Sequence, residues 1–461
     1  MVAHACVAQG MLGTLNLLAG FSRPARGAEK CRRRERPLRF SVHIATHEEP
    51  PAMVVATLRS LAAQVRAPQF EVIVLDNNTS DPSLWRPLEQ ACLDLGPHFR
   101  FLHVDGIKGA KAGALNIALK MTDPLATHVV IVDADYQVTP DFLATAATEL
   151  QHCDDDFLQF PQAYRNDSGS AAGLSLELAD YFLRHAREAD HVGAMLLTGT
   201  LSVISRDALE ATGGWSGATI TEDAELGLRL RRLGFKGRFV DRTVGRGLLP
   251  LDFAGLSIQR YRWTAGNADT VRSGMKGLPL RTAIQIFAQL TAWSNMALPL
   301  AAGLIGGALS LHLGGETDQA ALLTALSGFG MLMVLLSVCL PMLIGTIIRR
   351  RPAFPVILGA LAARIAMIVP SAVATVDAVM GHPGGFRRTS KDVGGASNAI
   401  GWLSPALAMA GVALLWNAAA LPWLGVAGAV LLLLPFPVAV ITSASLASYR
   451  SSVSTMKDIR T

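Results

Sequence analysis

The sequence predicts an α/β domain followed by a bundle of apolar helices, and two observations carry this prediction. First, the 461-residue chain is 51% hydrophobic and only 17% charged, whereas soluble globular proteins carry about a quarter charged residues. The deficit lies in residues 281–461, which hold 11 Lys and Arg and 5 Asp and Glu. Second, short apolar runs alternate with helical patterns in residues 38–279, as in α/β folds. Together these features exclude a disordered, fibrous or wholly soluble protein.

Residues 38–279 contain alternating strand and helix signals. The predicted strands are Arg39–Ala45, Phe70–Leu75, Arg100–Val104 and His128–Val132. The helices predicted between them are Met53–Ala63, Leu84–Leu95 and Lys111–Met121. Continuous apolar runs are typical of a parallel sheet buried on both faces, and such sheets bind ligands at the carboxyl ends of their strands. Asp76, Asp133 and Asp135 follow predicted strands, so they are candidate site residues.

The charge-poor tail contains several segments close to the roughly 20 apolar residues that a membrane-spanning helix needs. Two transmembrane helices are predicted within residues 297–348, and two more within residues 400–447. Three consecutive arginines at 349–351 follow the first pair and indicate the cytoplasmic side of the membrane. Residues 448–461 are then predicted to form a cytosolic tail.

Two other segments of the tail are predicted to lie along the membrane surface. Residues 280–296 are apolar but include Arg281 and polar side chains. Phe354–Met380 is longer and more apolar, but it contains Arg364 and Asp377. Because each of these charges would cost about 2.5–3.5 kcal/mol at the centre of a bilayer, a surface position is favoured.

Residues 1–37 are predicted to be a marginal membrane anchor followed by a basic juxtamembrane segment. The apolar run Ala5–Phe21 has no charged region before it, and a basic run follows it, which disfavours a signal peptide. Whether this run spans the membrane stays open. The net charge of +5 lies largely beside apolar segments, which favours lipid headgroups over nucleic acid as its partner. Five cysteines without C-x-x-C spacing fit a reducing cytosol.

The first chemical motif is Asp133-Ala134-Asp135, at the end of the last predicted strand. It places two carboxylates one residue apart. Mg²⁺ is usually held by one or two carboxylates together with substrate phosphates. An isolated pair of this kind also serves to cap loop amides, so the motif alone leaves both interpretations open.

The second motif is Thr221-Glu222-Asp223, just before a helical pattern over Ala224–Leu233. Thr221 is a candidate N-cap, and acidic residues favour the positive end of a helix. A carboxylate in this position is also a candidate general base that deprotonates a bound hydroxyl.

The third motif is Gln259-Arg260-Tyr261-Arg262-Trp263. Guanidinium groups bind phosphate oxygens in pairs, and the face of a Trp ring suits a stacked sugar. A basic and aromatic anchor beside the membrane is the competing interpretation.

In this order, the motifs resemble those of the processive, inverting family 2 glycosyltransferases, the group that includes cellulose synthase. Further segments match the family pattern: Lys111–Asn116, Phe157–Gln162, Gly199–Thr200 and, as the gating loop, Phe386–Lys391. Cellulose synthases often have Asp-Asp-Gly where this chain has Asp76-Asn77-Asn78. In this segment the chain looks closer to the bacterial β-1,3-, mixed-linkage or cyclic glucan synthases. The resemblance implies a Rossmann-like, glycosyltransferase A-type domain at 38–279, ahead of the transmembrane bundle.

The resemblance also implies a role for each matching residue. Asp223 would be the catalytic base. The donor-binding residues would be Asp76, Lys111, Asp133, Asp135, Gln259, Arg260 and Arg262. Asp133 and Asp135 would also bind the metal ion, Mg²⁺ or Mn²⁺. Glu222 and Trp263 would contact the acceptor, and a gating loop at 381–395 would close over the nucleotide through Phe386, Thr389 and Lys391.

The implied function is a multi-pass β-glucan synthase of the bacterial inner membrane with a cytosolic catalytic domain. Its partners would be UDP-glucose, the growing polysaccharide, the lipid bilayer and accessory export subunits, with no nucleic acid. Three alternatives stay open: UDP-N-acetylglucosamine as donor, non-processive transfer to a lipid or short acceptor, and a catalytically silent transporter or scaffold. The sequence does not fix the linkage, the regulators or the oligomeric state.

Overall fold

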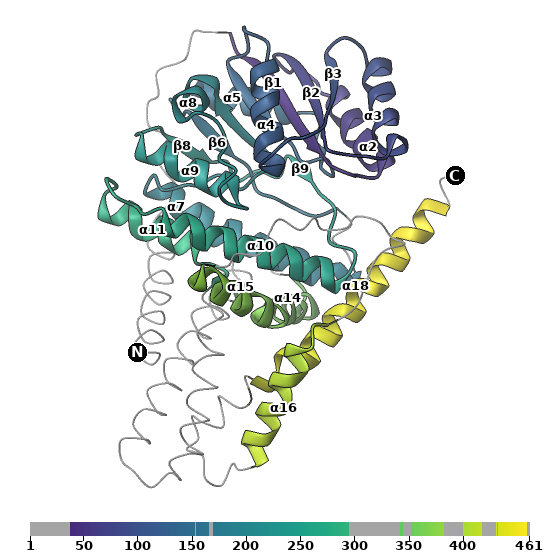
Figure 1. Cartoon of the computed structure of the whole chain (residues 1–461), viewed down its shortest axis with the longest axis vertical. Helices are drawn as coiled ribbons and strands as arrows, with labels where there is room; N and C mark the ends of the chain where they lie inside the picture. Colours follow the sequence, from purple (N-terminus) through teal and green to yellow (C-terminus); the bar gives the residue numbers. More distant parts are fainter. Residues whose placement is uncertain are drawn as a thin grey trace.

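The computed structural model describes residues 37–152, 154–165, 169–294, 342–343, 352–381, 400–416, 430 and 432–458. Within these ranges an α/β domain lies above a layer of helices (Figure 1). Several predictions fall outside the described residues. They concern the N-terminal anchor, nearly all of residues 297–348, and the gating-loop residues Phe386, Thr389 and Lys391.

A seven-stranded sheet forms the centre of the α/β domain, in the order β3-β2-β1-β4-β7-β6-β8. The four predicted strands are confirmed and pair in parallel: β1 (Arg39–Thr46), β2 (Gln69–Asn77), β3 (Phe99–Val104) and β4 (His128–Ile131). Three further strands, each of three or four residues, were not predicted: β6 (Phe157–Gln159), β7 (Ser202–Ser205) and β8 (Gly237–Phe239). β7 is antiparallel to both β4 and β6. A separate ribbon joins β5 (Gln137–Val138) to β9 (Gly245–Arg246).

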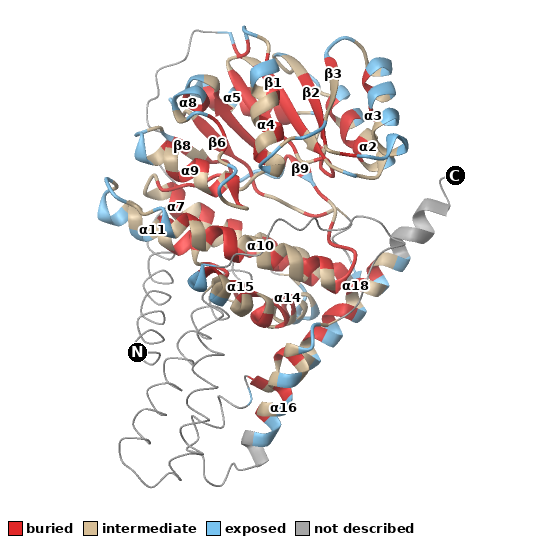
Figure 2. Cartoon of the chain, viewed as in Figure 1, coloured by how far each residue is buried: buried red, intermediate tan, exposed pale blue. Residues whose placement is uncertain are grey.

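Helices cover both faces of this sheet, and the strands between them are largely buried (Figure 2). The three predicted helices are confirmed, and three more follow along the chain: α2 (Pro51–Ala62), α3 (Pro82–Leu95), α4 (Ala110–Met121), α5 (Phe142–His152), α8 (Arg206–Thr212) and α9 (Glu222–Arg232). Alternate strand residues enter different clusters. Val130 belongs to the core beneath α2, α3 and α5. Its neighbours Val129 and Ile131 pack with residues of α4, α8 and α9. Burial on both faces explains why these strands have no polar alternation.

A second layer of helices lies against the carboxyl edge of the sheet. Its elements are η1 (Gly169–Ala171), α6 (Ala172–Tyr181), the π-helical η2 (Phe182–Ala186), α7 (Arg187–His191), α10 (Phe253–Arg272) and α11 (Leu280–Leu290). The longest is α10, which begins where the Asp252 side chain accepts a hydrogen bond from the Gly255 N–H at 2.6 Å. This helix separates the α/β domain from the apolar helices on its other side (Figure 1).

The described apolar helices are α14 (Phe354–Ala366), α15 (Ile368–Met380), α16 (Leu403–Trp416) and α18 (Pro435–Asp458). Within the described ranges, Phe354–Met380 has the length and apolar composition of a membrane-crossing helix, and 50% of its most apolar window is buried inside the protein. α14 packs on α6 and α18, and α15 packs on α10. The membrane bundle and the surface position of this segment stay predictions. α18 continues past residue 447 to Asp458, so residues 448–458, within the predicted cytosolic tail, are helical.

Candidate active site

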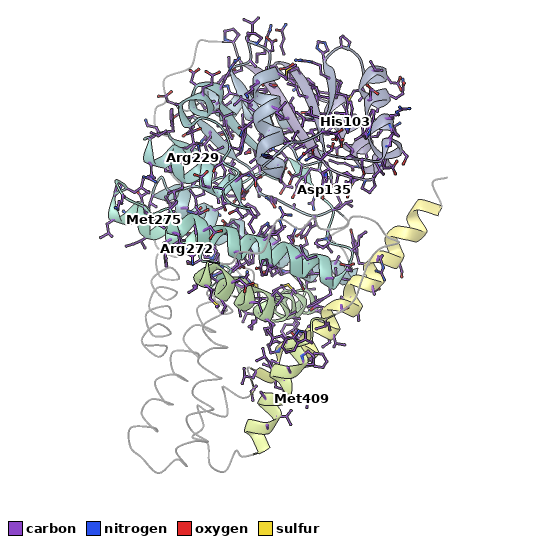
Figure 3. The ribbon with its side chains drawn as sticks, in the orientation of Figure 1. His103, Asp135, Arg229, Arg272, Met275 and Met409 are labelled. Atoms are coloured by element: carbon purple, nitrogen blue, oxygen red, sulfur yellow. The ribbon has the colours of Figure 1, made fainter. Side chains whose placement is uncertain are left out.

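A cavity of about 400 Å³ lies between the carboxyl edge of the sheet and α10. Loops after β1, β2 and β4 line one side, and α10 lines the other. Asp135 lies in this region, on the side of the α/β domain that faces α10 (Figure 3). Carboxylates outnumber cations in the lining: Glu49, Asp133, Asp135, Glu222 and Asp223 against Lys111 and Arg262. Such an excess of negative charge suits a site that receives cations as well as a substrate.

Lys111 connects the two acidic motifs. It lies in the first turn of α4, and its Nζ donates to Asp133 Oδ1 at 2.5 Å and to the Gly199 carbonyl oxygen at 2.8 Å. The same Nζ is 3.9 Å from Glu222 Oε1. Burial alone would lower the pKa of the Lys111 ammonium, but the neighbouring carboxylates raise it above its usual value. Lys111 is therefore a fixed positive charge at the centre of the cavity.

Asp133 and Asp135 leave the end of β4 as predicted, and both line the cavity. The Asp133 N–H donates a hydrogen bond to Thr200 Oγ1 at 2.9 Å. Asp135 is 8% exposed, and its Oδ2 accepts from the Leu248 N–H at 3.2 Å. These contacts fix the turn so that both carboxylates reach one cavity.

The donor set of the cavity fits a divalent metal ion that is shared with a substrate. In the described part of the chain, no group of three or more His, Cys, Asp and Glu side chains is placed to hold a metal alone. Asp133 and Asp135 supply hard oxygen ligands of the kind that Mg²⁺ and Mn²⁺ accept. Phosphate oxygens of a bound nucleotide would complete the set, and the surplus of carboxylates in the lining favours a cation there.

Asp223 has the properties of a general base. Burial, followed by the charge of Glu222, raises the pKa of the Asp223 carboxyl from 3.8 to about 7, while Lys111 opposes this shift. A base with a pKa near the working pH is well matched to accept a proton from a hydroxyl. Gly199 has a φ of +88°, and a Cβ there would lie 2.9 Å from Asp223 Oδ2. Only glycine therefore allows the backbone to approach this carboxylate so closely.

The Thr221-Glu222-Asp223 motif begins α9, two residues earlier than the helical pattern predicts. Thr221 occupies the N-cap position, but its side chain makes no capping hydrogen bond. Its hydroxyl instead lies beside Thr219 and Gly266. Thr221 is therefore the N-cap residue, as predicted, but its side chain does not cap the helix with a hydrogen bond. Glu222 and Asp223 both line the cavity, so this motif serves the site as well as the helix start.

The third motif lies on α10, and the helix divides its residues between two faces. Gln259, Arg262 and Trp263 line the cavity, as their spacing of three and four residues allows. Arg260 is 1% exposed and pairs with Glu177 of α6. It is absent from the cavity lining, which Arg262 of the same motif enters. The helical period places it about a quarter-turn away from Gln259.

Asp76 lies at the carboxyl end of β2, as predicted, but its side chain is not part of the cavity lining. It is 1% exposed and lies beneath the cavity, where it accepts hydrogen bonds from Thr46 and Thr79 and contacts His103 Nδ1 at 2.7 Å. The adjacent Asn77 lines the cavity, with its Nδ2 donating to the Ala110 carbonyl oxygen at 3.2 Å. Strand alternation explains the difference, because neighbouring residues of β2 point in opposite directions.

Some lining residues were not assigned a role from the sequence. The clearest are Thr46, His47, Asn77 and Asn78, which lie at the carboxyl ends of β1 and β2. Their position at the ends of apolar strands indicates a site, but uncharged side chains are a weaker signal for binding or catalysis than the carboxylate of Asp76. Trp293, which follows α11, lines a narrower cavity of about 50 Å³ that shares Asp223 and Trp263 with the main one.

Comparison with known proteins agrees with this geometry. The model of the family described as "Glycosyl transferase family group 2" matches residues 128–367, and the model of "Glycosyl transferase family 2" matches residues 41–213. The chain belongs to glycosyl transferase family 2. It is cellulose synthase-like, as the motifs predict. The α/β domain is a glycosyltransferase A-type nucleotide-sugar fold, and the protein is a glycosyltransferase.

Two sequence relatives and one solved structure are similar to this chain. A glucomannan 4-beta-mannosyltransferase 7 of Arabidopsis thaliana is 29% identical over 48% of this chain and 41% of its own length. The UDP-forming cellulose synthase catalytic subunit of Xanthomonas axonopodis pv. citri is 30% identical over 50% of this chain and 32% of its own. The mannosyltransferase of Pyrobaculum calidifontis, solved with GDP-mannose and Mn²⁺, has a TM-score of 0.53 at 19% identity, covering 82% of this chain and 98% of its own. The chain thus matches less than half of the two sequence relatives.

Proposed function

We propose that the protein transfers glucose from UDP-glucose, with inversion, to the end of a growing β-glucan. The observation that carries this proposal is the single cavity that contains Asp223, the Asp133–Asp135 pair, Lys111 and the α10 residues Arg262 and Trp263. A base, phosphate-binding cations and a sugar-stacking ring are the parts that such a transfer needs.

The reaction follows from this arrangement. Asp223 accepts the proton of the acceptor hydroxyl as its oxygen forms a bond to the anomeric carbon of the donor. The bond from that carbon to the diphosphate oxygen breaks, and its electron pair leaves with the nucleoside diphosphate. Lys111 and Arg262 stabilise the departing negative charge. Because the single displacement uses no enzyme nucleophile, the configuration at the anomeric carbon inverts.

A divalent ion, Mg²⁺ or Mn²⁺, fits Asp133 and Asp135 and would neutralise diphosphate charge when bound. Lys111, already paired with Asp133, keeps that carboxylate oriented before the donor arrives. Glu222 raises the pKa of Asp223 and so keeps the base matched to neutral pH. Trp263 lines both cavities beside Asp223, and its ring is the stacking surface for the acceptor end.

We place the enzyme in the bacterial inner membrane with the α/β domain in the cytosol, where nucleotide-sugars are made. The apolar segment Phe354–Met380 and the charge-poor tail support a membrane location. Helices that pack together can enclose a polar path through hydrocarbon, which a sugar polymer needs for export. The gating-loop residues Phe386, Thr389 and Lys391 complete this proposal as a cover for the bound nucleotide.

A second donor, GDP-mannose, is favoured by two observations. The plant relatives are named glucomannan 4-beta-mannosyltransferases, and the Pyrobaculum calidifontis structure holds GDP-mannose. Both donors present a sugar on a nucleoside diphosphate, so the same catalytic groups serve either one.

The test is to incubate membranes that contain the full chain with labelled UDP-glucose, UDP-N-acetylglucosamine or GDP-mannose in separate reactions. Polymer that forms from UDP-glucose and is degraded by a linkage-specific β-glucanase supports the proposal and fixes the linkage. Polymer from GDP-mannose alone selects the second donor, and short products only select the non-processive alternative. If the intact protein releases no nucleotide and forms no product, the silent transporter or scaffold is selected instead. The matched control is Asp223→Asn.

A further inference from the structure

A cluster of buried charges and tryptophans lies on the side of α10 that faces away from the cavity. Its members come from α6, α10, α14 and the segment after α11: Glu177, Asp180, Arg260, Arg364 and Trp293. Each is at most 5% exposed. Trp263 joins the cluster on one side and lines the cavity on the other.

Arg260 is the centre of this cluster. It pairs with Glu177, and its guanidinium carbon lies 4.7 Å from the centre of the Trp263 ring and 4.2 Å from that of Trp293. Its Nε and Nη1 make no hydrogen bond in the part of the chain that the structure describes. A buried guanidinium without full hydrogen bonding is costly. The two ring faces supply the compensating interaction for these N–H groups.

The far side of the cluster belongs to the apolar helix α14. Arg364 Nε is 3.0 Å from Glu177 Oε1, and Arg364 Nη2 is 3.3 Å from Asp180 Oδ2. The Arg364 guanidinium carbon is also 5.0 Å from the centre of the Trp293 ring. One residue along α10, the Tyr261 hydroxyl donates to Asp377 Oδ2 of α15 at 2.7 Å. Both charged residues of the apolar segment therefore bind the helical layer beneath the cavity.

We propose that Arg260 is a positioning residue that holds the Trp263 ring in place at the acceptor side of the cavity, with Glu177 and Arg364 holding Arg260. This inference rests on the proposed function, because it assigns the acceptor to Trp263. A Trp side chain has two freely rotating bonds, so a fixed ring binds a sugar at lower entropic cost. Because Arg260 contacts one face of the Trp263 ring, the other face stays open to the acceptor. Through Arg364, the apolar segment Phe354–Met380 then supports the acceptor site.

The experiment is a double-mutant cycle on the full chain in membranes, with Arg260→Lys and Trp263→Ala singly and together. Lysine keeps the charge beside Glu177 but loses the planar group that stacks on the rings. We expect Arg260→Lys to raise the KM for a β-linked gluco-oligosaccharide about 2–5-fold, from the size of one cation–π contact, and by no more than Trp263→Ala does. UDP affinity should stay within about twofold of wild type. In the Trp263→Ala background, Arg260→Lys should have no further effect, because Arg260 acts through that ring.

Independent, multiplicative effects in the cycle would overturn the proposal, as would equal losses of UDP and oligosaccharide binding. Arg364→Lys tests the same idea if Arg260→Lys does not fold, with a smaller rise in the same KM. Arg229→Lys is the matched control, because Arg229 also pairs with a carboxylate, Glu225, but lies away from the cavity on α9 (Figure 3).

Calorimetric titration with the same oligosaccharide and no donor separates this inference from the proposed function. If wild type binds the oligosaccharide and Arg260→Lys binds it more weakly, the positioning role stands even where no donor is turned over. If wild type makes polymer but Arg260→Lys binds the oligosaccharide as tightly as wild type, the positioning role is wrong and the proposed function stands. Absence of binding by wild type overturns the assignment of the acceptor to Trp263.

Discussion

The two charged clusters on either side of α10 differ in exposure and in charge balance. The cavity cluster is open to solvent and has more carboxylates than cations. The buried cluster is nearly sealed, and each of its carboxylates faces a guanidinium: Glu177 faces Arg260 and Arg364, and Asp180 faces Arg184 and Arg364.

This difference indicates which charges can bind a substrate or transfer a proton and which stabilise the packing of helices. A buried and balanced cluster holds helices together, because losing one partner leaves the other charge unpaired. In the open cluster the carboxylates outnumber the cations, so a bound ligand or metal ion is needed to balance their charge. Burial and the neighbouring Glu222 also raise the pKa of Asp223 in this cluster. α10 joins the two, since consecutive residues of one motif enter different clusters.

The largest effect is expected for Asp223→Asn. Removing the base should lower the rate of transfer about 10²–10⁴-fold, the usual contribution of general acid–base catalysis. Donor binding should be largely retained, because Asp223 does not bind phosphate in this mechanism. Radiolabelled polymer and UDP titration measure the two quantities. Wild-type turnover in this variant would remove Asp223 as the base.

Next in size is Asp135→Asn. It should weaken donor binding about 10–100-fold in the presence of Mg²⁺, by analogy with the loss of groups that orient a metal. The variant should respond less steeply to added Mg²⁺ or Mn²⁺, and a chelator should abolish wild-type activity. Binding of UDP over a metal titration is the measurement. The same metal dependence in variant and wild type would contradict the assignment.

Trp263→Ala should act mainly on the acceptor. Loss of a stacked ring should raise the acceptor KM about 2–10-fold and shorten the product. UDP affinity should change little. Product length on a gel and UDP titration test this prediction, and a loss confined to UDP binding would show that the ring does not stack the acceptor.

The pH dependence should sharpen the comparison, because the cavity cluster contains a base, Asp223, with a pKa near neutrality. Since the carboxylate form of Asp223 accepts the proton, activity should rise with pH and level off above about 7. The effect on stability has the opposite sign. A carboxyl whose pKa is raised by folding favours the folded state below its unfolded pKa of 3.8, and this contribution is lost as the pH rises through about 7.

The stability side of this prediction is testable with one variant. Asp223→Asn should raise the Tm at pH 8, where the native carboxylate is charged and buried, and should raise it less at pH 5, where the native carboxyl is still protonated. Thermal unfolding of the purified full chain at both pH values gives the comparison. An equal change at the two pH values would mean that ionisation of Asp223 does not oppose folding.

The smallest effect is expected for Thr200→Val. It removes the acceptor of the Asp133 N–H and should cost about 1 kcal/mol of stability. A modest rise in the KM for the donor should follow as the Asp133 turn loosens. Thr212→Val is a matched control, since the Thr212 hydroxyl donates to the Leu209 carbonyl oxygen of its own helix. An unchanged donor KM in Thr200→Val would show that this hydrogen bond does not position Asp133.

Much of the fold was already determined by the sequence. The four parallel strands and the three helices between them follow from apolar runs, turn residues and caps, which are local signals. Asp133 and Asp135 line the cavity because residues at the carboxyl ends of parallel strands meet at one edge. Lys111, Glu222 and Asp223 reach the same cavity from the first turns of α4 and α9. The short strands β6, β7 and β8 could not be predicted, since their pairing depends on distant partners.

Only the tertiary structure decided which face of each element a motif residue occupies. Asp76 and Arg260 belong to motif segments, yet both are buried away from the cavity while Asn77 and Arg262 line it. Local spacing gives relative directions along a strand or helix, but the absolute direction is set by packing against other elements. The sequence thus determined the chemistry available to this protein. Contacts between residues far apart in the chain decided which charges face the substrate and which hold the helices together.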